Sequence, residues 1–145
     1  MNEFMQLGIT DTLARLLYKN GIKTPTEIQR AAIPAIFKGR DIVGRSETGT
    51  GKTLAYLLPV MQRVRTDTEN TQVLIMTPTR ELAKQVFQVA GTFAKDMNID
   101  VTDVIGGRTI ENQIQKLKRD PHIVIGTPGR LLDHLKRRTL DLSLI

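Results

Sequence analysis

The sequence predicts an α/β fold in which helices flank a parallel β-sheet. Three observations lead to this fold class. Short β-favouring runs alternate with stretches long enough to form helices, a glycine-rich loop joins the first run to the next helix, and two later runs end in the same Thr-Pro-x-Arg turn. Strands that alternate with helices are typical of a parallel sheet, because the helices form the crossover connections.

Two helices are expected before the first strand. Thr10 is a candidate N-cap for the first helix, which should end before Gly21, since glycine is favoured just past a helix end. The second helix should begin with Thr24 as its N-cap, Pro25 in the first helical position and Glu27 closing a capping box.

The other expected elements follow in alternation. The expected strands span residues 41–44, 72–76, 100–105 and 122–125. The expected helices span residues 52–65, 80–97, 109–119 and 130–137. The carboxyl ends of parallel strands meet at one edge of the sheet, and open α/β sheets bind ligands at that edge. The turns after these strands are therefore the candidate functional segments.

Length and composition are those of an ordinary globular domain. The chain has 145 residues, of which 40% are hydrophobic and 25% charged. Its apolar runs are much shorter than the ~20 residues needed to cross a bilayer, and no secretory signal is visible. The absence of cysteine excludes disulfides and thiolate metal sites. We therefore expect a cytoplasmic protein that does not associate with membranes.

The glycine-rich loop at residues 46–53 has the context of a phosphate-binding P-loop, because it follows an expected strand and opens a helix. Gly49 and Gly51 let the backbone curl into an anion nest, to which the helix N-terminus adds partial positive charge. Lys52 can reach the β- and γ-phosphates of a nucleotide, and Thr53 can coordinate Mg²⁺. The first loop residue is a serine where the general pattern has glycine. A P-loop alone does not choose among kinases, GTPases, transporters and helicases.

The positive charge of the chain is unevenly distributed. The net charge is +6, and residues 108–138 carry eight basic and three acidic residues, a net of +5. This excess indicates a polyanionic partner, although a solvated helical face would have the same composition. His122 and His134 have no partners at metal-ligand spacing, so no catalytic role is predicted for either.

Together these segments resemble the first RecA-like domain of a DEAD-box RNA helicase of the bacterial type. That family accepts alanine or serine at the head of its P-loop. Residues 21–29 resemble its Q motif, and Phe4 stands 17 residues before Gly21, where the family has an isolated aromatic residue. Residues 78–83 resemble motif Ia, residues 106–107 the GG motif and residues 127–130 motif Ib. The resemblance covers essentially the whole chain in the right order.

The resemblance implies a RecA-like P-loop NTPase fold with ATP and Mg²⁺ as cofactors. The implied nucleotide-binding residues are Phe4, Gln29, Ser46, Glu47, Thr48, Gly49, Thr50, Gly51, Lys52 and Thr53. Lys52 and Thr53 are also the expected catalytic residues, and Thr53 is the expected metal ligand. The Gln29 amide can pair with adenine N6 and N7, and Phe4 can stack on the base. Taken alone, Gln29 would be a surface residue of a helix and Phe4 a core anchor.

RNA is the implied partner. The implied RNA-binding residues are Pro78, Thr79, Arg80, Gly106, Gly107, Arg108, Thr127, Pro128, Gly129 and Arg130. Each Thr-Pro-x-Arg turn joins a hydroxyl, a guanidinium and a helix N-terminus, which together suit phosphodiester oxygens. Because contacts to phosphates carry no base information, we expect sequence-independent binding to single-stranded RNA. For Arg80 and Arg130 the alternative is a structural salt bridge.

The resemblance also indicates what the chain lacks. It implies a Q-motif region at residues 1–30 and part of the first RecA-like domain at residues 31–145, one structural unit truncated before the Asp-Glu-Ala-Asp strand and without a second RecA-like domain. The intact enzyme would couple ATP hydrolysis to RNA unwinding, with ribonucleoprotein or RNA-decay partners bound through carboxyl-terminal regions. This chain should bind without turnover and be marginally stable, because Ile42, Val43 and residues 123–125 would lack apolar neighbours. A non-catalytic nucleotide- or RNA-binding module and a P-loop DNA helicase are the alternatives.

Overall fold

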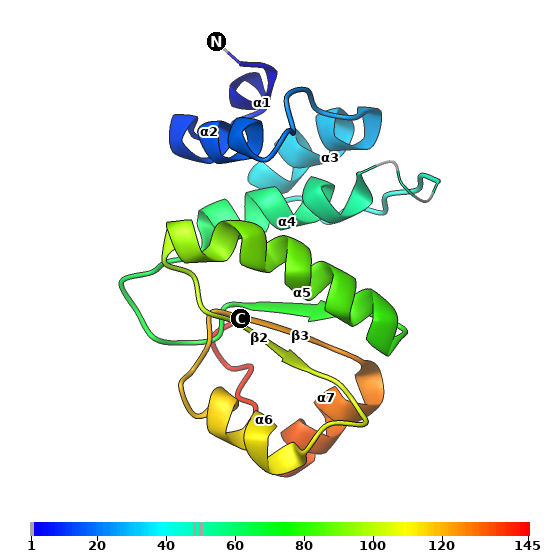
Figure 1. Ribbon diagram of the computed structural model, residues 1–145, viewed down its shortest axis with the longest axis vertical. Helices are drawn as coiled ribbons and strands as arrows, with labels where there is room; N and C mark the ends of the chain where they lie inside the picture. The colour runs from blue at the N-terminus through cyan, green and yellow to red at the C-terminus, as the bar shows by residue number, and fades with distance from the viewer. Residues whose placement is uncertain (1, 48, 50) are drawn as a thin grey trace. The chain divides into compact units, whose positions relative to one another are not determined.

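The computed structural model (Figure 1) describes residues 2–47, 49 and 51–145, which divide into two compact units. The first unit ends at Arg63 and the second begins at Val64. The expected boundary between residues 30 and 31 falls inside a helix of the first unit, so it does not coincide with this division and stays a prediction. None of the described helices combines the length and hydrophobicity that a membrane crossing requires.

The first unit is helical among its described residues. Its helices are α1 (Glu3–Gln6), α2 (Asp11–Lys19), α3 (Glu27–Phe37) and α4 (Lys52–Arg63), of which α3 and α4 pack together. Thr10 caps α2 as predicted, since its hydroxyl accepts a hydrogen bond from the Leu13 backbone N–H at 3.3 Å. Gly21, just past the end of α2, has φ 79°, a left-handed conformation that glycine adopts without a steric cost. The short helix α1 was not predicted.

The predicted start of α3 was wrong by two residues. Its N-cap is Thr26, and Gln29 closes the capping box. The Thr26 backbone N–H donates to Gln29 Oε1 at 2.9 Å, and the Gln29 N–H donates to the Thr26 hydroxyl at 3.5 Å. Thr26 prevails over Thr24 as the N-cap because the amide of Gln29 reaches back to satisfy its N–H.

The second unit contains the parallel sheet, formed by β1 (Val73–Met76), β2 (Val101–Val104) and β3 (Ile123–Gly126) in the order β1-β3-β2. Ile123 of β3 is in register with Val73 of β1 and Val101 of β2. These three strands confirm the predicted ones to within a residue at either end. All four residues of β3 are buried, which corrects the expectation that residues 123–125 lack neighbours. The expectation failed because β3 is the central strand.

Helices cover both faces of this sheet, as Figure 1 shows. Helix α5 (Arg80–Ala94), extended by a 3-10 turn at Lys95–Met97, packs on β2 and β3. Helices α6 (Ile110–Leu117) and α7 (Pro128–Lys136) lie on the opposite face. There, Leu117 and Leu131 form a core with Val104 and Val124. All three helices were predicted, although α7 begins two residues earlier because Pro128 occupies its first position.

The predicted strand at residues 41–44 does not form. Strands are stabilised by hydrogen bonds to a neighbouring strand, and no described strand pairs with this segment. Ile42 is 42% exposed and Val43 94% exposed, as expected for apolar residues without neighbours.

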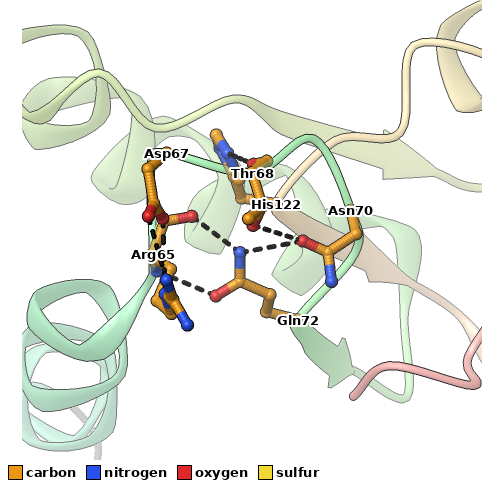
Figure 2. Close-up of polar contacts among 6 residues, drawn as sticks. All are labelled: Arg65, Asp67, Thr68, Asn70, Gln72 and His122. Atoms are coloured by element: carbon orange, nitrogen blue, oxygen red, sulfur yellow. Dashed lines mark hydrogen bonds and ion pairs between the residues drawn. The ribbon is translucent and has the colours of Figure 1, made fainter.

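Polar contacts hold the loop at residues 64–72 in place (Figure 2). The Gln72 side-chain amide makes two hydrogen bonds with the backbone of Arg65: Oε1 accepts from the N–H and Nε2 donates to the carbonyl, both at 2.8 Å. His122 Nδ1 accepts from the Asp100 N–H at 2.9 Å, which leaves Nε2 protonated to donate to the Thr68 carbonyl at 3.0 Å. His122 therefore has a structural role.

Candidate phosphate-binding sites

The described residues of the P-loop segment, in the first unit, lead into α4. Gly49 has φ 83° and Gly51 φ 91°, conformations that strain any residue with a Cβ. Lys52 opens α4, and its Nζ donates to the Ser46 carbonyl at 2.6 Å. The lysine side chain therefore folds back over the turn. Of the predicted nucleotide-binding residues, Thr48 and Thr50 lie outside the described residues.

Gln29 joins the capping box of α3 to this turn. It is only 2% exposed, and its Nε2 donates to the Gly51 carbonyl at 3.1 Å. A Cβ at Gly51 would lie 2.5 Å from that nitrogen, so glycine is needed for the approach. These two contacts leave one N–H and one lone pair of the buried Gln29 amide unused. The contact with Gly51 was not predicted, because no local pattern connects residues 22 positions apart.

Phe4 and Thr53 also have roles within the fold: Phe4 is buried, and Thr53 forms a hydrogen bond with Tyr56. Phe4 is completely buried, which is the core-anchor alternative; stacking on a base would need an exposed ring face. Thr53 lies in the first turn of α4. Burial raises the pKa of the Tyr56 phenol, and a hydrogen bond with Thr53 opposes this shift.

A second candidate site lies in the second unit, where strands β1, β2 and β3 end. It is an open cleft of about 560 Å³ lined by Pro78, Thr79, Arg80, Glu81, Gly106, Thr127, Gly129 and Arg130. Seven of the ten predicted RNA-binding residues line it, and three separate stretches of sequence contribute them. Gly107, Arg108 and Pro128 do not line the cleft. The convergence follows from the parallel sheet, because the turns after the strands share one edge.

Arg80, in the turn after β1, has no counter-ion among the residues that the structure describes. Thr79 caps α5 through a hydrogen bond from the Leu82 N–H at 3.1 Å, and the Thr77 hydroxyl donates to the Thr79 carbonyl at 3.1 Å. Among the described residues, Arg80 makes neither an ion pair nor a side-chain hydrogen bond. Its guanidinium lies against Gly107, where a Cβ would be 2.6 Å from Nη1. The salt-bridge alternative therefore does not apply to Arg80 here.

The turn after β3 holds its arginine differently. Arg130 Nη1 donates to the Arg108 carbonyl at 3.1 Å and to Gln113 Oε1 at 3.0 Å. Both acceptors are neutral, so Arg130 retains its full charge. The side chain of Arg108, in contrast, is paired with the buried carboxylate of Asp103 at 3.1 Å. Arg80 and Arg130 are therefore the uncompensated cations of the cleft, and Glu81 is its one acidic residue among those the structure describes.

Two buried side chains lie behind Arg130: Gln113 contacts Arg130, and His134 contacts Gln113. Neither contact was predicted. Gln113 and His134 are 3% and 0% exposed. His134 Nε2 lies 2.8 Å from Gln113 Oε1, and its Nδ1 lies 2.7 Å from the Thr139 hydroxyl. Burial, aided by the charge of Arg130, lowers the pKa of His134. The sequence did contain a signal, because Gln113 interrupts the apolar stripe of α6 between Ile110 and Leu117.

Comparisons with known proteins agree with this arrangement. The DEAD/DEAH box helicase family matches residues 26–145. The chain is 42% identical over 141 residues to the ATP-dependent RNA helicase CshA of Limosilactobacillus reuteri, covering 97% of this chain and 28% of that protein. It is also 42% identical over 143 residues to the DEAD-box ATP-dependent RNA helicase CshA of Bacillus cereus, covering 99% of this chain and 27% of that protein. The chain thus spans little more than a quarter of these relatives.

Solved structures give the same result. A DEAD box protein from Methanococcus jannaschii has a TM-score of 0.92 and 34% identity over 100% of this chain and 40% of its own. The RNA helicase Prp28 from Chaetomium thermophilum, bound to ADP, has a TM-score of 0.89 and 37% identity over 99% of this chain and 36% of its own. The fold is therefore part of the RecA-like α/β fold of these helicases. Since the family match covers most of the sequence, this chain belongs to the DEAD/DEAH box helicase family.

Proposed function

We propose that this chain binds ATP through the P-loop of its first unit and the backbone of single-stranded RNA through the cleft of its second unit. The observation that carries this proposal is the convergence of two Thr-Pro-x-Arg turns and Gly106 on one cleft, in which Arg80 and Arg130 have no counter-ion among the described residues. In a protein of the relatives' full length, these sites would serve ATP-dependent unwinding of RNA in the cytoplasm, with further partners bound outside this chain.

The residues of the P-loop fit a nucleotide. Gly49 and Gly51 have positive φ, as the left-handed positions of an anion nest do, and the N-terminus of α4 adds its dipole. A phosphate would compete with the Ser46 carbonyl for Lys52, since the ammonium would then pair with an anion instead of a neutral carbonyl. Thr53 offers the oxygen ligand that Mg²⁺ prefers, and the metal would neutralise phosphate charge. The remaining amide groups of Gln29 would select adenine.

The cleft fits a polyanion that is recognised without regard to sequence. Its cations are arginines, whose planar forks match phosphate oxygens, and none of the described residues that line it is an aromatic on which bases could stack. Contacts of this kind are made to the sugar-phosphate backbone and weaken as salt is added.

The proposal is tested by titrating this chain with a fluorescent ATP analogue and, separately, with labelled single-stranded RNA. Lys52→Ala should abolish nucleotide binding and leave RNA binding intact, whereas Arg80→Ala should do the reverse. Arg15→Ala is the matched control, because Arg15 is an exposed arginine of the first unit that pairs with Asp11 on the surface. Equal affinity of the wild type and Arg80→Ala for RNA would rule out the cleft. Preference for DNA of the same length would point to a DNA helicase.

A further inference from the structure

We propose that Gln113 is a positioning residue for RNA binding, which holds one nitrogen of the Arg130 guanidinium so that the other edge of the guanidinium is presented to a phosphate. The inference rests on the proposed RNA-binding function of the cleft. It assigns a role to a buried residue that does not line the cleft itself.

The orientation of the Gln113 amide is fixed by its neighbours. Its Nε2 donates to the Ile105 carbonyl at 2.8 Å, while its Oε1 accepts from Arg130 at 3.0 Å. If the amide were turned over, its oxygen would face the Ile105 carbonyl and its N–H groups would face the Arg130 donors. Only the observed orientation satisfies both neighbours, so the oxygen is always directed at Arg130.

The hydrogen bonds of Arg130 leave one edge of its guanidinium available. Nη1 carries two N–H groups, and both are used, one on Gln113 Oε1 and one on the Arg108 carbonyl. Nε and Nη2 donate to no other residue in the described part of the chain. The Nε–Nη2 edge is a planar pair of donors that matches two phosphate oxygens. Because Arg130 lines the cleft, this edge is the one that an RNA backbone would meet.

His134 completes the arrangement without neutralising Arg130. Its Nε2 donates to the second lone pair of Gln113 Oε1, because an amide oxygen can only accept, while its Nδ1 lies 2.7 Å from the Thr139 hydroxyl, which donates to the His134 carbonyl at 3.1 Å. Gln113 thus holds Arg130 with a saturated, uncharged oxygen. An acidic residue in its place would cancel the charge that a phosphate requires, as Asp103 partly does for Arg108.

The test compares Gln113→Ala with Gln72→Ala in the 145-residue chain, using labelled oligouridylate. Gln72 is the control, because it is a glutamine of the second unit whose amide also both donates and accepts, but it lies in the loop of Figure 2 and away from Arg130. Gln113→Ala should weaken RNA binding on the order of tenfold, the equivalent of one charge-assisted hydrogen bond. It should also lower the salt dependence of log K by about 0.7, the value for one phosphate contact of a single strand. Gln72→Ala should change neither quantity.

A double-mutant cycle separates positioning from general damage. In an Arg130→Ala background, Gln113→Ala should cause no further loss of RNA affinity. If Gln113→Ala does not fold, Gln113→Met takes its place, since it keeps most of the side-chain volume but removes the oxygen that holds Arg130. NMR of the arginine side chains gives a readout without RNA: rotation of the Arg130 guanidinium should be slow in the wild type and fast in Gln113→Ala.

Two results would overturn the inference while leaving the proposed function intact. One is wild-type RNA affinity in a folded Gln113 variant, and the other is an equal loss of affinity in the presence and absence of Arg130. Failure of the wild type itself to bind RNA would instead remove the proposed function.

Discussion

At the level of single residues, two glycines with the same backbone conformation differ in what surrounds them. Gly107 has φ 81° and Gly39 has φ 77°, but a Cβ at Gly107 would press on the Arg80 guanidinium, whereas nothing lies within 4 Å of a Cβ at Gly39. Alanine should cost about 1–2 kcal/mol of stability at either position. Gly107→Ala should in addition displace Arg80 and weaken RNA binding about tenfold, the value of one charged hydrogen bond. Binding titrations that gave the same RNA affinity for both variants would contradict this.

His134 should make stability depend on pH. Its pKa is lowered in the folded chain by burial and by Arg130, so the unfolded chain binds the proton more readily. The free energy of unfolding should therefore be highest above the ordinary histidine pKa of about 6.5 and should fall as the pH is lowered through the folded pKa. The slope for this group cannot exceed about 1.4 kcal/mol per pH unit. Urea unfolding between about pH 7 and pH 5 should show a smaller slope for His134→Gln; identical slopes would exclude the effect.

The role of a residue could be predicted where its contacts are local in sequence and could not be predicted where they join distant segments. The turn residues of the cleft could be predicted, because Thr, Pro, Gly and Arg directly after a strand form a local pattern. The contact between Gln29 and Gly51 and the contact between Gln113 and Arg130 could not be predicted, because each joins segments distant in sequence. The place of Gln113 in the apolar stripe of α6 indicates only that this residue is buried, although glutamine is mostly an exposed residue type.

At the level of elements, alanine substitution of two glycines, one in a helix and one in a strand, should change the stability of the chain in opposite directions. Gly91 lies inside α5 with open space around it, so Gly91→Ala should stabilise the chain by about 1 kcal/mol through helix propensity. Gly126 ends β3, where a Cβ would lie 2.7 Å from the Val104 carbonyl, so Gly126→Ala should destabilise it by about 3 kcal/mol. Urea unfolding of the two variants provides the measurement. A loss of stability in Gly91→Ala would show that its environment is not open.

Strands could be predicted from the sequence where the chain also supplies the neighbouring strands and helices that stabilise them. The strands at β1, β2 and β3 alternate with amphipathic helices that cover them, so the apolar runs were sufficient. The run at residues 41–44 also contains the β-branched residues Ile42 and Val43 but has no neighbouring strand among the described residues, and Val43 is 94% exposed. An apolar run therefore indicates only that a segment can form a strand, and the strand forms where a neighbouring strand is available for pairing.

At the level of the whole molecule, the exposed segment and the small sheet indicate limited stability. Three four-residue strands form the sheet, and Ile42, Val43 and Met76 are exposed apolar residues. We expect a melting midpoint below about 60 °C, the upper end of the range for ordinary mesophilic domains. Calorimetry provides the measurement, and a midpoint clearly above that temperature would mean that these exposed residues cost little.

The chain as a whole should bind ATP without hydrolysing it. Hydrolysis requires acidic residues that hold Mg²⁺ and orient water, in addition to a cradle for the phosphates. Strands β1, β2 and β3 are followed by Thr77, Ile105 and Thr127, so no described strand ends in adjacent acidic residues. Phosphate release from ATP should therefore stay at background even with saturating RNA, while the fluorescent analogue still binds. Turnover that Lys52→Ala abolishes would show that the chain supplies these acidic groups from elsewhere, and the proposed division between binding and hydrolysis would be wrong.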